Sequence, residues 1–183
     1  MAPFIGDPSD YDVTSFKDGM KGACLCGNIT VDIKQKGLFD KPNGHVCHCF
    51  NCRRFAGGSH INILCLPTAN TTVSDPKSFL KTYEDRDTGS DNTVPRSFCS
   101  NCGSPIGCVP LIKEPRLSMV ALGLFPKMPE PEFEVFTKHR QDWARPATEK
   151  AEQCDFADVF AKYVAPMMDS FALGSDAGNS RRP

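Results

Sequence analysis

The sequence contains Cys24-Leu25-Cys26-Gly27 near its start and Cys99-Ser100-Asn101-Cys102-Gly103 in its second half. On a strand, residues two apart project to the same face, so the first pair can offer two sulfurs to one ion. The second pair can do so through a tight turn, and each pair precedes a glycine that tolerates left-handed backbone. Four thiolates fill a tetrahedral zinc shell, which predicts a structural site joining two distant segments. The alternative is a buried pair plus a redox Cys-x-x-Cys, although a redox motif normally lies at a helix start.

A second cysteine group is Cys47-His48-Cys49-Phe50-Asn51-Cys52. On a regular strand its first two cysteines share one face, and the third returns after a turn. Three protein ligands and one open position are typical of catalytic zinc, and the open position would accept a substrate thiolate. The alternatives are free cysteines or a closed structural site, completed by one further side chain from His45, His60 or Cys65.

The composition is that of an ordinary globular protein. The chain has 183 residues, of which 40% are hydrophobic and 23% charged, with a formal net charge of -1. Surfaces that bind nucleic acid or anionic lipid carry an excess of lysine and arginine, so neither a nucleic-acid nor a membrane partner is expected. No stretch resembles a secretory signal or a transmembrane helix. In the cytoplasmic, reducing setting expected from this, ten cysteines indicate metal ligands or catalytic thiols rather than disulfides.

Short apolar runs separated by turn signals predict a mainly β fold of antiparallel sheets. Ile29, Val31 and Ile33 alternate with polar residues, as in a half-buried strand. Further strands are expected at residues 61–66, 79–83, 106–109, 117–122 and 133–136. Apolar residues at helical spacing predict a C-terminal helix over about residues 149–164. The expected organisation is an N-terminal arm (1–20), one zinc domain (21–165) and a flexible tail (166–183).

The ordered motifs GACLCG, CHCFNCRR and RSFCSNCGSPI resemble those of the glutathione-dependent formaldehyde-activating enzyme family, also called GFA or centromere-protein-V-like. The resemblance covers roughly residues 20–145 and implies a β-tent, a small zinc-bound arrangement of antiparallel sheets. The sequence departs from the family pattern at residues 122–125, which could reshape a substrate pocket. The resemblance implies two zinc ions per chain. One would be held by Cys24, Cys26, Cys99 and Cys102, and the other by Cys47, Cys49 and Cys52.

The resemblance also implies an activity, the addition of glutathione to formaldehyde to give S-hydroxymethylglutathione, which is carbon–sulfur lyase chemistry in reverse. In this hypothesis the second cysteine group carries the catalysis and binds a thiol substrate such as glutathione. Arg53 or Arg54 would bind a substrate carboxylate, and His48 or His60 would relay a proton. Two alternatives remain open: an enzyme of the same fold that acts on a specialised metabolite, and a non-catalytic scaffold or chromatin-associated zinc protein.

Overall fold

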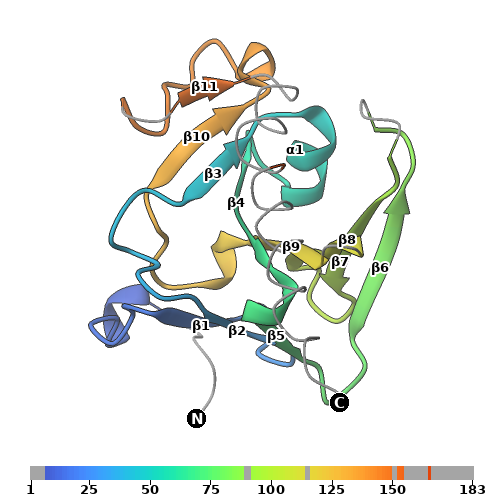
Figure 1. The fold of residues 1–183 in the computed structure, drawn as a ribbon. Helices are drawn as coiled ribbons and strands as arrows, with labels where there is room; N and C mark the ends of the chain where they lie inside the picture. Colours follow the sequence, from blue (N-terminus) through green and yellow to red (C-terminus); the bar gives the residue numbers. More distant parts are fainter. Residues whose placement is uncertain (1–6, 89–91, 114–115, 150–151, 155–164, 166–183) are drawn as a thin grey trace, which may run out of the picture.

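The computed structural model describes residues 7–88, 92–113, 116–149 and 152–154, together with Ala165. Within these residues the chain forms a three-stranded and an eight-stranded sheet, so the mainly β prediction is confirmed. The smaller sheet lies across the foot of the larger one, and the helix α1 (Phe50–Ala56) lies toward the opposite end (Figure 1). Short 3-10 turns occur at four places, namely Pro8–Asp10, Thr68–Asn70, Leu122–Leu124 and Thr137–His139.

The smaller sheet consists of β1 (Gly19–Ala23), β2 (Thr30–Lys34) and β5 (Thr71–Ser74), paired antiparallel in the order β1-β2-β5. Val31 and Ile33 are buried, whereas Asp32 between them and Thr30 before them are partly exposed. This alternation is the one that the sequence predicts, because successive strand residues face opposite sides of a sheet.

The larger sheet has the order β11-β10-β3-β4-β9-β8-β7-β6. Its pairs are antiparallel except at one edge, where β10 runs parallel to both β3 and β11. The expectation of antiparallel sheets is therefore wrong at that edge. The strands are β3 (Gly44–Cys47), β4 (Ile61–Pro67), β6 (Leu80–Asp85), β7 (Val94–Cys99), β8 (Pro105–Lys113), β9 (Arg116–Ala121), β10 (Pro131–Val135) and β11 (Glu152–Cys154).

The predicted C-terminal helix overlaps this edge. Its residues Glu152–Cys154 form β11, whose backbone pairs with β10, so the prediction is wrong for these three residues. Helical periodicity is a weak signal that pairing with an available sheet edge can override. Residues 150–151 and 155–164 of the predicted helix lie outside the described residues, as do residues 1–6 of the expected arm and the expected tail.

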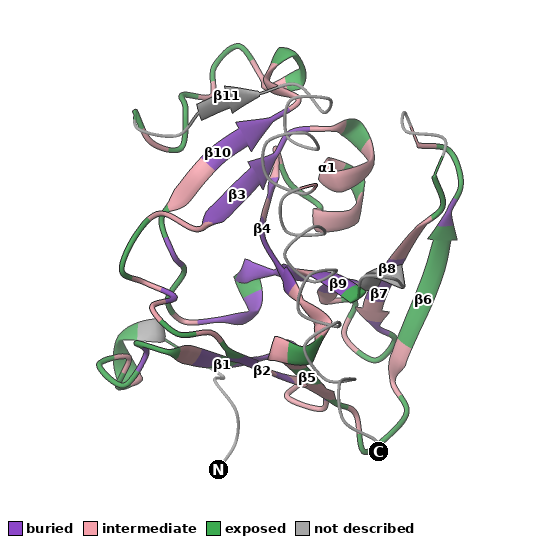
Figure 2. Ribbon diagram, in the orientation of Figure 1, coloured by how far each residue is buried: buried purple, intermediate pink, exposed green. Residues whose placement is uncertain are grey.

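The core joins the two sheets. Met20 and Ile33 of the smaller sheet belong to the same buried cluster as Leu64, Ile106 and Val120 of the larger one. A second cluster lies beneath α1 and contains Cys47 together with residues of β4, β9 and β10. Burial is concentrated on β3, β4, β9 and β10, whereas β6 is largely exposed (Figure 2). The second cysteine group therefore has Cys47 within a buried cluster, whereas Cys49 and Cys52 are partly buried and pack against it.

Replacing Leu64 with Ala should lower the free energy of unfolding of the metal-saturated protein by about 2–5 kcal/mol, because the fully buried side chain would leave a cavity. The measurement is urea unfolding, with Met128→Ala as the control. Met128 is 45% exposed, and its truncation should change the free energy by about 0.5 kcal/mol. Equal effects of the two substitutions would contradict the core described above.

Candidate metal centres

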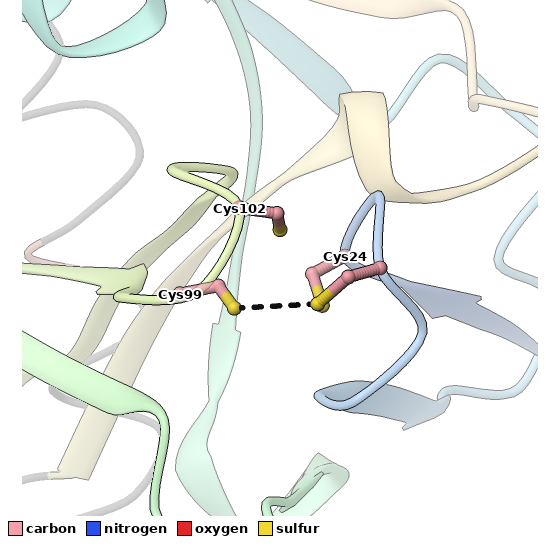
Figure 3. A group of neighbouring side chains, drawn as sticks. Cys24, Cys99 and Cys102 are labelled. Atoms are coloured by element: carbon pink, nitrogen blue, oxygen red, sulfur yellow. Dashed lines mark hydrogen bonds between the residues drawn. The ribbon is translucent and has the colours of Figure 1, made fainter.

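The first cysteine cluster lies where two hairpin turns meet. Cys24 and Cys26 come from the turn between β1 and β2, whereas Cys99 ends β7 and Cys102 lies in the turn from β7 to β8. The four sulfurs all lie within 4.8 Å of one another. Figure 3 shows Cys24, Cys99 and Cys102 directing their sulfurs toward a common space. The cluster therefore connects the smaller sheet to the larger one.

Each turn is closed by a backbone hydrogen bond from a glycine, over three residues in the first turn and four in the second. Gly27 donates its N–H to the Cys24 carbonyl at 2.8 Å, and Gly103 donates to the Cys99 carbonyl at 2.8 Å. Both glycines have positive φ, 72° and 75°, a conformation that a Cβ atom would disfavour. The role that the sequence predicts for these two glycines is confirmed.

Donors from the turns point at the sulfurs. The Ile29 N–H lies 3.3 Å from Cys24 Sγ, and Asn28 Nδ2 lies 3.1 Å from Cys26 Sγ. A hydrogen bond from the Asn101 side chain lowers the pKa of Cys26 to about 5, whereas burial raises the pKa of Cys99 to about 12. Four cysteine sulfurs this close together suit zinc, and they leave no open position, so the cluster could hold a structural ion.

The second cluster is built differently from the first. Cys47 ends β3, Cys49 is the N-cap of α1, and Cys52 lies in the first turn of that helix. The Cys52 N–H donates to Cys49 Sγ at 3.4 Å, so the thiol takes the place of the usual capping hydroxyl. Sequence reasoning placed Cys49 on a strand with Cys47 and missed the helix. The reason is that Cys is not among the preferred N-cap residues.

The three sulfurs of the second cluster also lie within 4.8 Å of one another. Among the residues whose side chains the structure describes, a set that leaves out Glu152 and Cys154, no histidine, aspartate, glutamate or further cysteine joins them within that distance. Cys65, which could have closed the shell, is instead buried on β4, where burial raises its pKa to about 11. The described protein ligands thus number three, the set that leaves one position open on a four-coordinate ion.

The three thiols of the second cluster differ in pKa. Hydrogen bonds from the Cys47 and Cys52 thiols hold the pKa of Cys49 well below its ordinary value. The bond to Cys49 raises the pKa of Cys47 well above its usual range. The bond to Cys47 lowers the pKa of Cys52, but the bond to Cys49 and burial together outweigh this effect and raise that pKa to about 11. A set of thiols that stabilises a thiolate in this way has the chemistry of a soft-metal site.

His48 points away from the sulfurs. Its Nε2 lies 2.6 Å from Glu134 Oε2, and both residues are buried. The other Glu134 oxygen accepts the Ala147 N–H at 2.8 Å, and Arg140 lies 3.5 Å from Oε2. His48 therefore ties the segment between two cysteines to β10, rather than facing the sulfurs.

His60 follows α1 and is half-buried. Its ring lies 5.7 Å from that of His48, and Ser59 Oγ is 3.0 Å from its Nδ1. Burial lowers its pKa below the ordinary value, so its imidazole is neutral at pH 7. His60 also lines a cavity of about 520 Å³, whose wall includes Ile61 and Ala121 of the cluster that contains Cys47.

Arg53 and Arg54 lie in α1, as the sequence places them, directly after Cys52. Arg54 is exposed, donates to Asn51 Oδ1 at 2.8 Å, and stacks over the Phe50 ring at 4.7 Å. Arg53 is half-buried and lies 5.8 Å from the same ring. Both cations are therefore within one helical turn of the second cluster.

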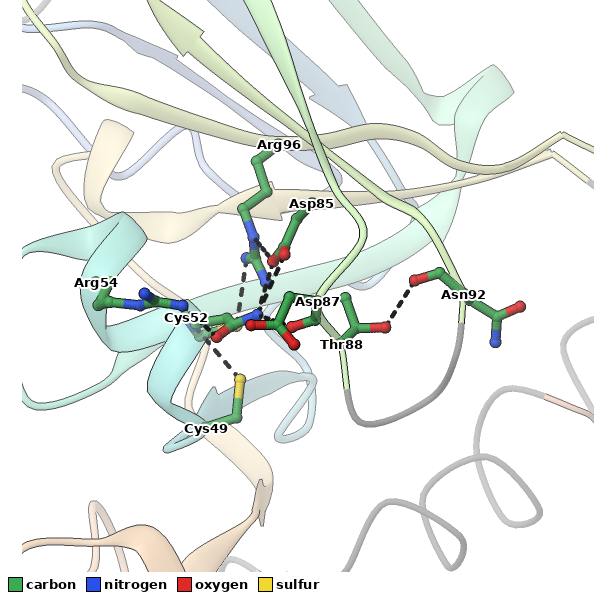
Figure 4. A network of polar contacts seen from close by, with 9 residues as sticks. Cys49, Cys52, Arg54, Asp85, Asp87, Thr88, Asn92 and Arg96 are labelled. Carbon is green, nitrogen blue, oxygen red and sulfur yellow. Dashed lines mark hydrogen bonds and ion pairs between the residues drawn. The ribbon is translucent and has the colours of Figure 1, made fainter.

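Sequence reasoning missed three polar residues beside this cluster. Arg96 of β7 has its Nη1 3.6 Å from Cys52 Sγ and its Nε 2.7 Å from Asp85 Oδ2 (Figure 4). Asn51, which lies between two of the cysteines, donates to both oxygens of Asp85 at 3.2 and 2.9 Å. Only Asn51 carried a sequence signal, through its place in the motif. Arg96 and Asp85 are far from the second cysteine motif in the chain, and the β6–β7 hairpin brings them next to it.

Replacing Cys99 with Ser should abolish metal binding at the first cluster and prevent stable folding. A structural zinc in a zinc finger contributes roughly 10–16 kcal/mol, which matches or exceeds the roughly 5–15 kcal/mol stability of a typical domain. The checks are the metal-to-protein ratio and circular dichroism. The control is Cys65→Ala, since Cys65 belongs to neither cluster and should retain all bound metal. A folded Cys99→Ser protein with undiminished metal would contradict the assignment.

None of the α-helices described in the structure is long and apolar enough to cross a membrane.

No curated protein matches the chain. Among solved structures, the crystal structure of a Rhodobacter sphaeroides protein from a structural genomics programme is similar. It is 17% identical, has a TM-score of 0.46, and the match covers 74% of this chain and 100% of that one. The model of the family described as glutathione-dependent formaldehyde-activating enzyme matches residues 19–139, a range that includes both cysteine clusters. The chain therefore belongs to the glutathione-dependent formaldehyde-activating enzyme (GFA) family.

Proposed function

We propose that this protein is a zinc enzyme of the carbon–sulfur lyase type, which binds a thiol such as glutathione and adds it to formaldehyde or a related small carbonyl compound. Two zinc ions per chain are proposed, one at each cysteine cluster. The observation that carries the proposal is the second cluster, where three sulfurs converge and no fourth ligand lies among the side chains that the structure describes. A structural site would need four ligands, as the first cluster has.

The chemistry that zinc supplies when held by Cys47, Cys49 and Cys52 is to lower the pKa of a thiol placed in the open position. The reaction forms one carbon–sulfur bond and breaks the π bond of the carbonyl group, while the thiol proton moves to the carbonyl oxygen. The chain must therefore hold the thiol, provide a route for one proton and keep the sulfur from competing reactions. A reducing compartment such as the cytoplasm suits this chemistry, because oxidised cysteines cannot bind the ion.

The residues near the cluster suit parts of this task. We assign to His60 the transfer of the proton, because it is neutral at pH 7 and lies at the cavity wall rather than in the closed interior. We assign to Arg53 and Arg54 the binding of substrate carboxylates, since each is a cation within a turn of Cys52. His48 holds the segment between Cys47 and Cys49 through Glu134, which orients the ligands.

One observation favours a second candidate, an enzyme of the same family that acts on an uncharged specialised metabolite. The cavity of about 520 Å³ is lined by residues such as Leu124, Phe125 and Pro126, and none of the described residues that line it is a lysine, arginine, aspartate or glutamate. Such a wall suits an apolar group better than a tripeptide with two carboxylates. The departure from the family pattern at residues 122–125 supplies part of that wall, including Gly123. No feature of the described residues specifically favours a chromatin-associated scaffold.

Zinc content and its protection test the proposed site. The purified protein should contain two zinc ions per chain, and Cys49→Ser should contain one while keeping its fold, because only the second cluster loses a ligand. Added glutathione should slow the removal of the second zinc by a chelator in the wild-type protein and have no effect on Cys49→Ser. Elemental analysis gives the ratio. The protein could instead hold two zinc ions whose removal by a chelator is slowed neither by glutathione nor by other thiols. That result would contradict an open thiol-binding position.

Catalysis itself is measured by exchange NMR with labelled formaldehyde and glutathione, since the two also react without protein. The wild-type protein should accelerate formation of the hydroxymethyl thioether at least tenfold over the protein-free mixture, and Cys49→Ser should not. A protein that binds glutathione but does not accelerate the reaction would redirect the proposal to the second candidate. Uncharged aromatic or alkyl aldehydes are then the compounds to assay.

The two arginines give a separate prediction. Replacing Arg53 and Arg54 together with Gln should raise KM for glutathione about tenfold or more while leaving kcat within about threefold, because binding of remote carboxylates is lost in both ground and transition states. Steady-state kinetics with glutathione and with the uncharged thiol 2-mercaptoethanol check this prediction, because only glutathione has carboxylates for the arginines to bind. If KM rose equally for both thiols, the arginines would not bind carboxylates.

A further inference from the structure

A buried ion pair lies directly beside the second cysteine cluster. Arg96 is 8% exposed and Asp85 5%, and they are joined by the 2.7 Å contact between Nε and Oδ2. The remaining face of the guanidinium is turned to the cluster, with Nη1 at 3.6 Å from Cys52 Sγ. One cation therefore contacts both a carboxylate and a cysteine that is expected to bind metal.

The pair is held by a chain of hydrogen bonds that begins in the cysteine motif itself. Asn51 donates to Asp85 through Nδ2, and the same amide nitrogen lies 2.7 Å from the Asp87 carbonyl. Through these bonds the end of β6 is attached to the first turn of α1 (Figure 4). The Arg96 guanidinium also lies over the Phe55 ring at 5.5 Å, which limits its movement.

The energetics of such a pair indicate a role other than stability. Burying two charges costs several kcal/mol per ion, and a well-packed apolar pair would often stabilise a fold equally well. What an apolar pair cannot do is donate a hydrogen bond to sulfur. A guanidinium does so with a fixed planar fork, in which Nε is engaged by Asp85 and Nη1 remains for Cys52.

Charge counting shows what that donor would do. A divalent ion and three thiolates carry one net negative charge, and a fourth thiolate from a substrate would make it two. In a buried site this added charge is costly unless a cation or donor lies nearby. Arg96 supplies that donor at one of the three cysteine sulfurs.

We propose that Arg96 is a positioning and specificity-determining residue of the second cluster, which draws charge from the Cys52 sulfur and so favours an anionic sulfur over a neutral fourth ligand. The inference rests on the proposed function, because it requires the open position to accept a thiolate. Asp85 and Asn51 act through Arg96, by fixing the direction of its Nη1.

The test compares an anionic and a neutral ligand in the cobalt-substituted full-length protein. Cobalt reports thiolate ligation in its absorption spectrum, so binding is measured without turnover. Titration with 2-mercaptoethanol should show Kd raised about tenfold or more in Arg96→Gln, since a hydrogen bond to a charged group is lost. The Kd for imidazole, measured in the same way, should change by less than about threefold in Arg96→Gln. Asp85→Asn should shift the thiol Kd in the same direction by a smaller factor.

Two further variants make the result specific. Arg86→Gln removes an arginine that is exposed and pairs with Glu84 on the same hairpin, so it should leave both titrations unchanged. Arg96→Lys retains the charge but not the planar fork, so it should recover only part of the thiol affinity.

Each outcome decides the proposal. Equal weakening of thiol and imidazole binding in Arg96→Gln would overturn it, as would loss of metal from both clusters together, because Arg96 would then act through the fold. A thiol affinity unchanged in Arg96→Gln would overturn the role of Arg96 alone and leave the proposed function standing. If the wild-type protein bound imidazole but no thiol, the proposed function would fail and the role of Arg96 with it.

Discussion

The meeting of two hairpin turns at four cysteine sulfurs is the constraint on which the rest of the structure depends. The turns after β1 and β7 belong to different sheets, and the sulfurs of Cys24 and Cys99 lie in the same buried core cluster as the apolar residues between those sheets. An ion held there would fix the smaller sheet and the β7–β8 hairpin relative to each other. Because β7 also pairs with β6, the same junction determines where Arg96 and Asp85 meet α1.

The two clusters use the same ligand chemistry but differ in backbone. In the first, each pair of sulfurs comes from a tight turn closed by a glycine of positive φ, and two turns complete a set of four. In the second, the chain leaves β3 and enters α1, so Cys49 and Cys52 belong to a helix start, and three sulfurs converge among the side chains that the structure describes. The difference between a set of four sulfurs and a set of three thus follows from local structure, not from residue type.

Cysteine spacing was enough to predict both clusters, because two or three ligands lie within a few residues in each motif. The alternation of apolar and polar residues was enough to predict β2, and short apolar runs were enough to predict most strands of the larger sheet. The sequence did not reveal α1, since a cysteine serves as its N-cap, nor the parallel pairing of β10, which depends on an edge that other strands create. Arg96 and Asp85 were also missed, because their approach to Cys52 is a property of the hairpin and has no counterpart in local sequence.

The central claim is that the second cluster keeps one position for a substrate sulfur. X-ray absorption at the zinc edge of the fully metal-loaded protein tests this claim most directly, because the spectrum gives the mean number of sulfur atoms bound to each zinc ion. A closed and an open site together predict about three and a half sulfurs, rising to about four when glutathione is added. A mean of four before any thiol is added, or no change on its addition, would contradict an open, thiol-accepting site.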